Sequence, residues 1–347
     1  MTRRMKENQR EPVPDSLTRV IVGRYWLIAV LVVSLATAAA AAILRHRVPA
    51  SSIGAKQQEI LTERPEIILL GNSLLDEGID TQTFAESVGR RTLKWASGGS
   101  ASAYWYLALK NVIAPCEHVP QWAIVFFSDT LLTQPSFRVT GNYRDLIERL
   151  ALPEEPILHQ LAYGTSSSRW ARAVEKYWSL YGGRHLLRDY AEMIVKRATA
   201  ALASVGEPDL ADATRSTFRP ENLDPMRFTA LQADADSTDV ADFTEKLARS
   251  LLPHMIDVMA EAGIGLGFVR VPLRRDALGQ PQSAELIEYI AELADYLASR
   301  GVPLIDLSKE TPLSEEQFAD GNHIDRETGS PPFTRLAAET LRRELAL

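Results

Sequence analysis

Short apolar runs alternate with amphipathic stretches along most of this sequence. The apolar runs lie at 66–71, 93–95, 122–127, 265–271 and 302–306. Each is short and rich in β-branched or aromatic residues, which is typical of buried strands. Apolar residues at helical spacing occupy the intervals, at 81–88, 103–112, 244–262, 283–299 and 332–345. Strands that alternate with helices predict an α/β fold, a three-layer sandwich in which about five parallel strands are covered on both faces.

One apolar run is too long for a strand. Residues 25–44 contain no charged side chain, and Arg24 and Arg45 bracket them. A helix of that length spans roughly 30 Å, the thickness of a bilayer core. Tyr25 and Trp26 lie where an interfacial aromatic belt is expected. We therefore predict a single transmembrane helix at 25–44, after a cytoplasmic tail at 1–24 and before a linker at 45–58.

The distribution of basic residues sets the predicted orientation. Six basic residues precede the apolar run and three follow it closely. This asymmetry places the N-terminus in the cytoplasm and the rest of the chain outside, as in a protein of the bacterial inner membrane with a periplasmic or extracellular domain. A cleaved signal peptide is the alternative, since 38–42 offers small residues, but the run is long and no clean cleavage site follows.

The remaining chain, 59–347, is predicted to be one domain with an insertion at about 133–240, between the third and fourth strands. The insertion is rich in aromatic residues and has helical periodicity at 169–180 and 186–202. It could act as a lid or docking surface. Equally, its aromatic side chains could fill a small helical core of their own, and the sequence leaves both interpretations open.

Overall composition excludes some classes of protein. The 347 residues carry a net charge of −7, which argues against a nucleic-acid-binding surface. Cys116 is the only cysteine, so neither an intrachain disulfide nor a cysteine-based zinc site can form, and we expect it to be a small buried side chain. The histidines other than His323 show no metal-like spacing. We expect no metal and no organic cofactor.

Two short stretches carry candidate chemistry. The first strand runs into Gly71-Asn72-Ser73, which places Ser73 at the carboxyl end of a central strand, where open α/β sheets bind ligands. Near the other end of the chain lies Asp320-Gly321-Asn322-His323. A turn there could bring the Asp320 carboxylate to one ring nitrogen of His323 and leave the other for Ser73. Either stretch alone also fits an ordinary polar turn. Gly321 and Asn322 are residues that suit a turn with positive φ angles, which we expect here.

Together these stretches resemble the blocks of the SGNH (GDSL) hydrolase superfamily. The blocks occur in order: Gly71-Asn72-Ser73 after the first strand, Gly98-Gly99 after the second, Ser128-Asp129 after the third, and Asp320-x-x-His323 before the last helix. The resemblance covers about 64–345, apart from the insertion. It implies Ser73 as nucleophile, His323 as general base and acid, and Asp320 as the residue that orients His323. It also implies an oxyanion hole formed in part by the backbone N–H groups of Ser73 and of Gly98 or Gly99.

Two positions depart from the family pattern. The first block has Asn72 where the family usually has aspartate. The third block usually reads Gly-x-Asn-Asp, but here it is Phe126-Phe127-Ser128-Asp129. Either Ser128 replaces the asparagine amide as an oxyanion donor, or another group does, or oxyanion stabilisation is weaker. The loss of one such donor can cost roughly 10²–10³ in rate. Asp129 and Arg270 lie at the same predicted edge and are further candidates for substrate binding, although exposed loop arginines are common.

The resemblance and the predicted anchor together imply an enzyme of the cell envelope. We expect an O-acyltransferase that uses an acyl-Ser73 intermediate to O-acetylate an exported cell-envelope polysaccharide, with a multi-span membrane acyltransferase as partner. An esterase that deacylates surface glycans or lipids would use the same residues. A third possibility is a non-catalytic scaffold with a relic site, which the altered third block keeps open.

Overall fold

The computed structural model describes residues 52–140, 142–164, 243–309, 313–345 and 347. Within them, five strands form one parallel sheet in the order β2-β1-β3-β4-β5. The strands are β1 (Ile67–Gly71), β2 (Thr92–Ala96), β3 (Trp122–Phe127), β4 (Gly265–Arg270) and β5 (Leu304–Asp306). This sheet confirms the predicted α/β class, and each strand lies within two residues of its expected bounds.

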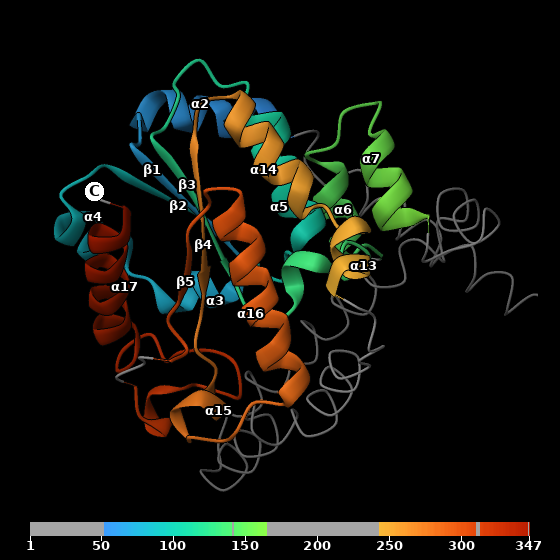
Figure 1. Ribbon diagram of the computed structural model, residues 1–347. Coiled ribbons are helices and arrows are strands. Elements are labelled where there is room, and N and C mark those ends of the chain that lie inside the picture. The colour runs from blue at the N-terminus through green and yellow to red at the C-terminus, as the bar shows by residue number, and fades with distance from the viewer. Residues whose placement is uncertain (1–51, 141, 165–242, 310–312, 346) are drawn as a thin grey trace, which may run out of the picture. The chain divides into compact units, whose positions relative to one another are not determined.

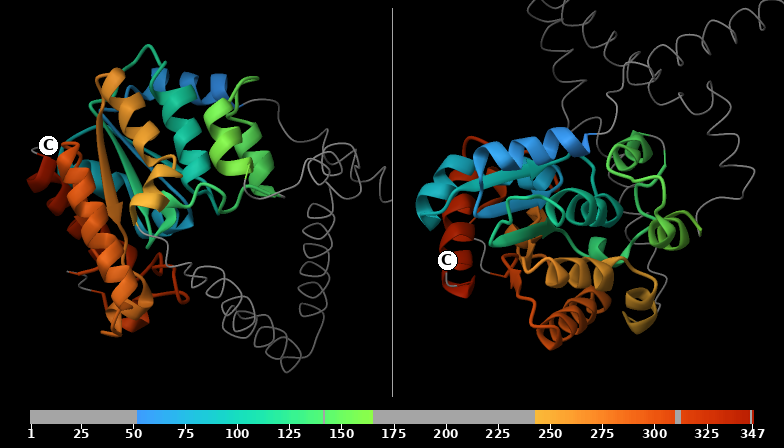
Figure 2. Two further views of the ribbon diagram at one scale, coloured as in Figure 1. Left: turned by 45° about the vertical axis from the view of Figure 1, so that its right-hand side comes forward. Right: turned by 90° about the horizontal axis from the view of Figure 1, so that it is seen from above.

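Helices cover both faces of the sheet, because successive side chains of a strand point to opposite faces. In β1, Ile68 and Leu70 belong to one core cluster, whereas Ile67 and Leu69 belong to the other. Figures 1 and 2 show the two helical layers. The first cluster is covered by α2 (Ile53–Glu63), α5 (Ser102–Leu107), its π-helical continuation η1 (Ala108–Ile113), α14 (Leu252–Glu261) and α16 (Ala284–Ser299). The second is covered by α3 (Ser73–Gly78), α4 (Thr81–Val88) and α17 (Ser330–Leu345).

The structure corrects two predicted boundaries. Residues 53–58 were assigned to the linker, but they form the first half of α2, which packs on the core through Ile60. The single helix expected at 244–262 is two helices, α13 (Phe243–Ala248) and α14. Pro253 lies in the first turn of α14, where its missing N–H leaves no helical hydrogen bond unmade, so it begins a new helix.

Only the first part of the predicted insertion lies within the described residues. It contains η2 (Leu131–Thr133), α6 (Asn142–Glu148), α7 (Pro156–Leu158) and η3 (His159–Tyr163). Glu155 fastens this part to the sheet domain: its buried carboxylate pairs with Lys110 at 2.6 Å and accepts a hydrogen bond from Asn111. The helices expected at 169–180 and 186–202, and the predicted span at 25–44, lie outside the described residues. No helix among the described residues is long and apolar enough to cross a bilayer.

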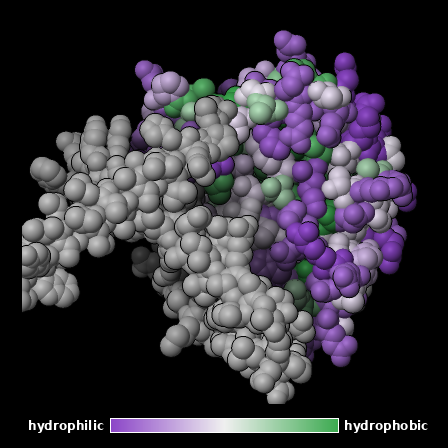
Figure 3. All heavy atoms as spheres, turned by 180° about the vertical axis from the view of Figure 1, so that it is seen from behind, coloured by the Kyte–Doolittle hydropathy of each residue, from purple (hydrophilic) through white to green (hydrophobic). Residues whose placement is uncertain are grey.

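Apolar side chains are scattered singly over the described surface. Four large apolar residues are clearly exposed in the described part of the chain, namely Val119, Leu152, Leu278 and Ile287. On the face seen in Figure 3, the described surface is mainly hydrophilic with small isolated apolar areas. Single exposed apolar residues are normal for a folded domain, so this face provides no evidence for a docking patch.

The strand order fixes where a ligand is expected. From β1 the chain moves to one side of the sheet to make β2, and then crosses to the other side for β3, β4 and β5. The order therefore reverses between β1 and β3. Open α/β sheets bind ligands at the carboxyl ends of the strands where such a reversal occurs. Figure 1 shows α3 and α15 (Arg274–Ala277) at this edge of the sheet.

Candidate active site

Ser73 lies at the point where the strand order reverses, directly after β1. The turn into α3 is tight, because a Cβ on Gly71 would come within 2.7 Å of the Leu75 Cβ. The Asn72 side chain begins the helix by accepting a hydrogen bond from the Leu74 N–H at 3.0 Å. Ser73 is thus the first residue of α3 and is half-buried, so its hydroxyl remains accessible to a ligand.

Asp320 organises the loop that carries His323. Its Oδ1 accepts hydrogen bonds from the backbone N–H groups of Asn322 and His323, both at 2.7 Å. The Ala319 N–H donates to the His323 carbonyl, which closes the loop. Neither Gly321 nor Asn322 has a positive φ, so that part of the prediction was wrong. Side-chain hydrogen bonds from an aspartate shape the turn instead.

The structure brings Ser73, His323 and Asp320 into one hydrogen-bonded chain. The Ser73 Oγ lies 2.8 Å from His323 Nε2, and His323 Nδ1 lies 2.7 Å from Asp320 Oδ2. All three side chains are partly exposed, so the arrangement is open to a substrate. These residues are 250 positions apart in sequence at their widest, and the fold alone makes them neighbours.

The charge on Asp320 decides how the protons are arranged. Burial favours the neutral acid, but hydrogen bonds from the His323 ring and from the N–H groups of Asn322 and His323 outweigh it and hold the pKa of Asp320 at about 2. An ionised carboxylate can only accept hydrogen bonds, so Nδ1 must donate. On a neutral ring Nε2 is then the acceptor, and the Ser73 hydroxyl donates its proton toward it.

Neighbouring elements hold the His323 loop against the sheet. The Arg274 N–H, at the start of α15, donates to the Gly321 carbonyl at 3.2 Å. On the other side of the loop, the Arg326 guanidinium pairs with Asp76 of α3 at 2.6 Å. The loop is therefore tied both to the helix that begins with Ser73 and to the segment that follows β4.

The second block lies beside Ser73. The Ser97 N–H and the Ser100 hydroxyl both donate to the Gly71 carbonyl at 3.0 Å, which fastens the turn after β2 to the end of β1. In the β1–β2 register Gly71 is opposite Ala96, and Gly98 follows two residues after this last pair. Gly99 has a φ of +72° and packs under the ring of Tyr143, where any Cβ would clash.

The third block lies on the opposite side of Ser73. Leu70 is opposite Val125 in the β1–β3 register, and Ser128 directly follows the end of β3 at Phe127. Ser128 is partly exposed, and its hydroxyl makes no hydrogen bond within the described part of the chain. The second and third blocks thus follow the two strands that pair with β1, and an oxyanion hole made by these residues stays a prediction.

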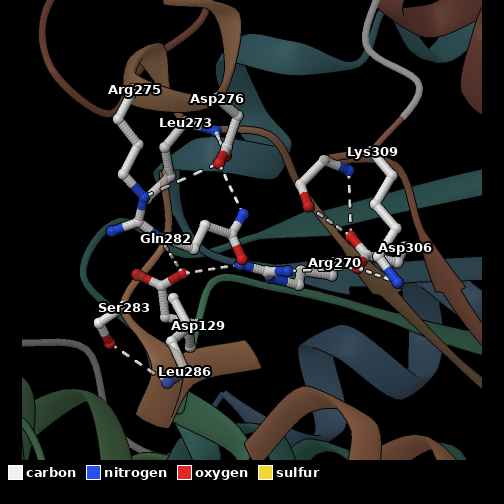
Figure 4. A network of polar contacts seen from close by, with 11 residues as sticks. Asp129, Arg270, Leu273, Arg275, Asp276, Gln282, Ser283, Leu286, Asp306 and Lys309 are labelled. Carbon is white, nitrogen blue, oxygen red and sulfur yellow. Dashed lines mark hydrogen bonds and ion pairs between the residues drawn. The ribbon is translucent and has the colours of Figure 1, made fainter. Parts of the chain in front are cut away.

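Arg270 is the centre of a polar network at the ends of three strands (Figure 4). Its guanidinium contacts Asp129 after β3 at 3.4 Å, Asp306 of β5 at 3.2 Å and Gln282 at 3.0 Å. Its side chain is only 1% exposed. The alternative of an exposed loop arginine was therefore wrong, whereas Arg270 as a substrate-binding residue stays a prediction, which its burial and its three polar partners disfavour.

Asp129 is held in place by this network. Two arginines, Arg270 and Arg275, pair with its Oδ1, and its backbone has a φ of +46°. A non-glycine residue in the left-handed region persists only where its surroundings hold it. Its carboxylate is already engaged by two cations, and whether it also contacts a substrate stays a prediction.

Several residues around the site were missed by sequence reasoning. Ser100 donates a hydrogen bond to Gly71 of the first block, Tyr143 packs on Gly99 of the second, and Asp306 pairs with Arg270. None of these residues belongs to a recognisable motif. Asp306 gave the clearest signal, since it is a charged residue at the end of an apolar strand. The described residues contain no group of three His, Cys, Asp or Glu side chains that could hold a metal ion. Cys116 is buried as expected.

Comparisons with known proteins add little to this geometry. No family model matches the sequence, and a search of curated proteins found no relative. Among solved structures, a provisionally named acylhydrolase from Bacteroides fragilis is similar over 86% of this chain and 93% of its own, with a TM-score of 0.38 and 10% identity. A GDSL-like lipase from Bacteroides thetaiotaomicron is similar over 84% and 98%, with a TM-score of 0.39 and 10% identity. Likenesses this distant carry no argument about the function of this chain.

Proposed function

We propose that this protein is an SGNH-type serine enzyme that transfers acyl groups through an acyl-Ser73 intermediate. One observation carries the proposal: the continuous hydrogen-bonded chain from Ser73 Oγ through His323 to Asp320, with contacts of 2.8 and 2.7 Å. It lies at the carboxyl edge of a parallel sheet, where such folds place their ligands. A serine hydroxyl needs a base to remove its proton, and the base needs an orienting group.

In the first half-reaction, Ser73 Oγ attacks the carbonyl carbon of an ester and His323 Nε2 takes the hydroxyl proton. Negative charge develops on the carbonyl oxygen, and we assign its stabilisation to the N–H groups of Ser73, Gly98 and Gly99 and to the hydroxyl of Ser128. The C–O bond to the leaving group then breaks, and His323 returns its proton to the departing alkoxide. The products are an alcohol and an acyl-Ser73 ester.

In the second half-reaction, an acceptor hydroxyl attacks the acyl-Ser73 carbonyl and gives its proton to His323. Collapse of the intermediate restores the Ser73 hydroxyl with that proton. Throughout the cycle Asp320 remains ionised and stabilises the imidazolium. We propose that the acceptor is a sugar hydroxyl of an exported cell-envelope polysaccharide and that the acyl group is acetyl. The predicted anchor at 25–44, in the bacterial inner membrane, would hold the enzyme beside such polymers and beside a multi-span membrane acyltransferase that supplies the acyl group.

Hydrolysis is the second candidate. Ser73 is partly exposed in the described structure, so water could reach an acyl-enzyme as readily as a sugar does. The protein would then be an esterase of surface glycans or lipids. Partitioning separates the two functions: the full chain is given an activated acetyl ester with and without an oligosaccharide acceptor. Acetylated oligosaccharide in excess of free acetate supports transfer, whereas free acetate alone supports hydrolysis.

The test of the shared chemistry is covalent labelling of the detergent-solubilised full chain with a fluorophosphonate. Ser73 Oγ should displace fluoride and form an O–P bond, which adds one label to the intact mass. We expect a single adduct on the parent and none on Ser73→Ala. His323→Ala should label at least about a hundredfold more slowly, since it lacks the general base. The exposed Ser136 provides a matched control, because Ser136→Ala should label like the parent.

A folded parent that takes up no label would contradict the proposal. So would labelling that persists unchanged in Ser73→Ala. Either result would favour the non-catalytic scaffold, in which the Ser73, His323 and Asp320 cluster is a relic.

A further inference from the structure

An arginine lies between two aromatic rings beside the second block. Arg138 belongs to the loop between η2 and α6, and its guanidinium carbon lies 5.0 Å from the Phe137 ring centroid and 5.2 Å from that of Tyr143. Tyr143 in turn packs directly on Gly99, one of the candidate oxyanion donors. We call Phe137, Arg138 and Tyr143 the Arg138 lip. The Tyr143 ring separates Arg138 from Gly99, which lies in the turn after β2.

The loop that carries the Arg138 lip is fastened to the sheet domain. The Ser102 hydroxyl donates to the Gln134 carbonyl at 3.1 Å, and the Gln134 side chain donates to Thr130 Oγ1 at 2.6 Å. Ser102 begins α5, three residues after the second block, and Thr130 directly follows the third. The position of the lip is therefore set by the same strand ends that position the candidate oxyanion hole.

The charge of Arg138 is not neutralised. In the described part of the chain its guanidinium stacks on the two rings but forms no hydrogen bond or ion pair. The other arginines around the candidate site differ, and each has a carboxylate partner there: Arg270 and Arg275 pair with Asp129, Arg274 with Glu315, and Arg326 with Asp76. A half-buried cation without a counter-charge creates a local positive potential.

Arg138 also has an unusual backbone conformation. Its φ is +54°, one of three positive φ angles among the non-glycine residues described. Arg64 is the C-terminal cap of α2, where a left-handed residue is common, and Asp129 is held by two ion pairs. Arg138 has neither explanation, although the conformation costs on the order of 1 kcal/mol or more. Strain of this kind tends to occur at ligand sites.

We propose that the Arg138 lip is a binding subsite for an anionic group, a carboxylate or a phosphate, on the polymer whose hydroxyl accepts the acyl group from Ser73. Within the described residues the guanidinium lies over the Phe137 and Tyr143 rings and forms no hydrogen bond or ion pair, so its N–H groups are available to a ligand. The edge of a guanidinium matches the oxygens of a carboxylate or phosphate in a bidentate pair. This inference rests on the proposed function, and it names the acceptor class as an anionic rather than a neutral polymer.

The test is equilibrium binding to the full chain that carries Ser73→Ala, so that nothing turns over during titration. Three probes of equal length are compared: oligogalacturonate as the carboxylate, oligo(glycerol phosphate) as the phosphate, and a neutral malto-oligosaccharide. We expect at least one anionic probe to bind more tightly than the neutral one. Adding Arg138→Gln should weaken anionic binding about tenfold or more and leave neutral binding unchanged, because a charge-assisted pair is lost. Arg138→Lys should fall between, since it keeps the charge but not the planar fork.

Arg64 provides a matched control. It is also an arginine with a left-handed backbone, but it lies at the amino edge of β1, away from Ser73. Arg64→Gln removes the same charge and should leave the affinity for every probe unchanged. The preference for the anionic probe should also fall as salt is raised, since the contact is electrostatic.

The inference is overturned if Arg138→Gln binds anionic probes as the Ser73→Ala parent does. It is equally overturned if neither anionic probe binds better than the neutral one. Failure of the proposed function is detected separately, by the absence of fluorophosphonate labelling at Ser73. A chain that labels at Ser73 but has no Arg138-dependent anion preference loses only the subsite.

Discussion

Asp320 makes three hydrogen bonds with its two carboxylate oxygens, and they explain both its charge and its position. Oδ1 accepts from two backbone N–H groups, which shapes the loop, and Oδ2 accepts from the His323 ring. One side chain thus fixes the loop conformation, the ring orientation and the tautomer. A substitution of Asp320 changes all three at once, whereas a change of pH acts through the charge of its carboxyl group.

The depressed pKa of Asp320 predicts a loss of stability in acid. Its folded pKa is held at about 2, below the ordinary 3.8, so its contribution is fully present above the unfolded pKa and is lost as pH falls. Linkage gives a loss of about 1 kcal/mol between pH 6 and pH 3. Urea unfolding at both pH values measures it. Asp320→Asn has no carboxyl group to titrate at this position. Between pH 6 and pH 3 its free energy of unfolding should therefore fall by about 1 kcal/mol less than that of the parent. Equal losses in both proteins would contradict the prediction.

Arg270 is the residue on which the network at the strand ends depends. It lies on β4, between the strands that lead to Asp129 and Asp306, and its two aspartate contacts join all three strand ends. A buried cation between two carboxylates carries a large desolvation cost, which is offset only while all partners are present.

We therefore predict that Arg270→Met lowers the free energy of unfolding by about 3–5 kcal/mol, because it leaves two carboxylates without their shared partner. Arg274→Met is the matched control: Arg274 is 41% exposed and pairs with Glu315, so its loss should cost no more than about 1 kcal/mol. Urea unfolding measures both. Equal effects of the two substitutions would show that the buried network contributes no special stability.

At the scale of elements, the turn after β2 links the sheet to the insertion. Its two glycines differ in their surroundings: a Cβ on Gly98 would meet nothing within 4 Å, whereas one on Gly99 would meet the Tyr143 ring at the start of α6. Gly99 also has a positive φ, which Gly98 does not. The first element of the insertion can approach the second block because position 99 has no side chain.

This difference predicts unequal effects of two otherwise similar substitutions. Gly99→Ala should destabilise the protein by about 1–3 kcal/mol, since it adds both a clash and a strained backbone. It should also slow labelling at Ser73, because the turn that carries two candidate oxyanion donors must shift. Gly98→Ala should stay within about 0.5 kcal/mol of the parent. Thermal unfolding and fluorophosphonate labelling measure the two effects, and a harmless Gly99→Ala would contradict the packing argument.

In the whole molecule, Ser52 precedes the first residue of α2 and follows the predicted transmembrane helix by eight residues. The Ser52 N–H donates to the Arg149 carbonyl, which follows α6. The chain therefore enters the described domain beside the first elements of the insertion. If residues 25–44 cross the membrane, only a short segment separates the bilayer from the start of α2.

The anchor is testable in a bacterial host. The full chain should stay in the membrane fraction after alkaline carbonate extraction, and deletion of 25–44 should release it, because that stretch supplies roughly 30 Å of apolar helix. Alkaline phosphatase fused after residue 347 should be active, since it folds only outside the cytoplasm. A fusion that is produced but inactive would contradict the predicted orientation. A mature chain that lacks its first 42 or so residues would support a cleaved signal peptide instead.

Much of the fold followed from local pattern. Apolar runs such as 122–127 are short and rich in β-branched or aromatic residues, which favours strands, and helical spacing at 81–88 and 283–299 placed helices within one residue of their bounds. The sequence pattern missed elements that are polar or too short to show a period. The polar segment at 53–58 is the start of α2, which packs through Ile60, and α3 and α15 are too short to have a period.

Local sequence was enough to predict the alternation of strands and helices, the candidates Ser73, Asp320 and His323, and the apolar run at 25–44, because each depends on residues close together in the chain. Which distant groups meet could be read only from the folded chain. There the turns after β2 and β3 follow the two strands that pair with β1, Arg270 is buried rather than exposed, and Arg138 lies over the Tyr143 ring that packs on Gly99. Such contacts depend on strand register and on burial, which combine residues that local sequence does not relate.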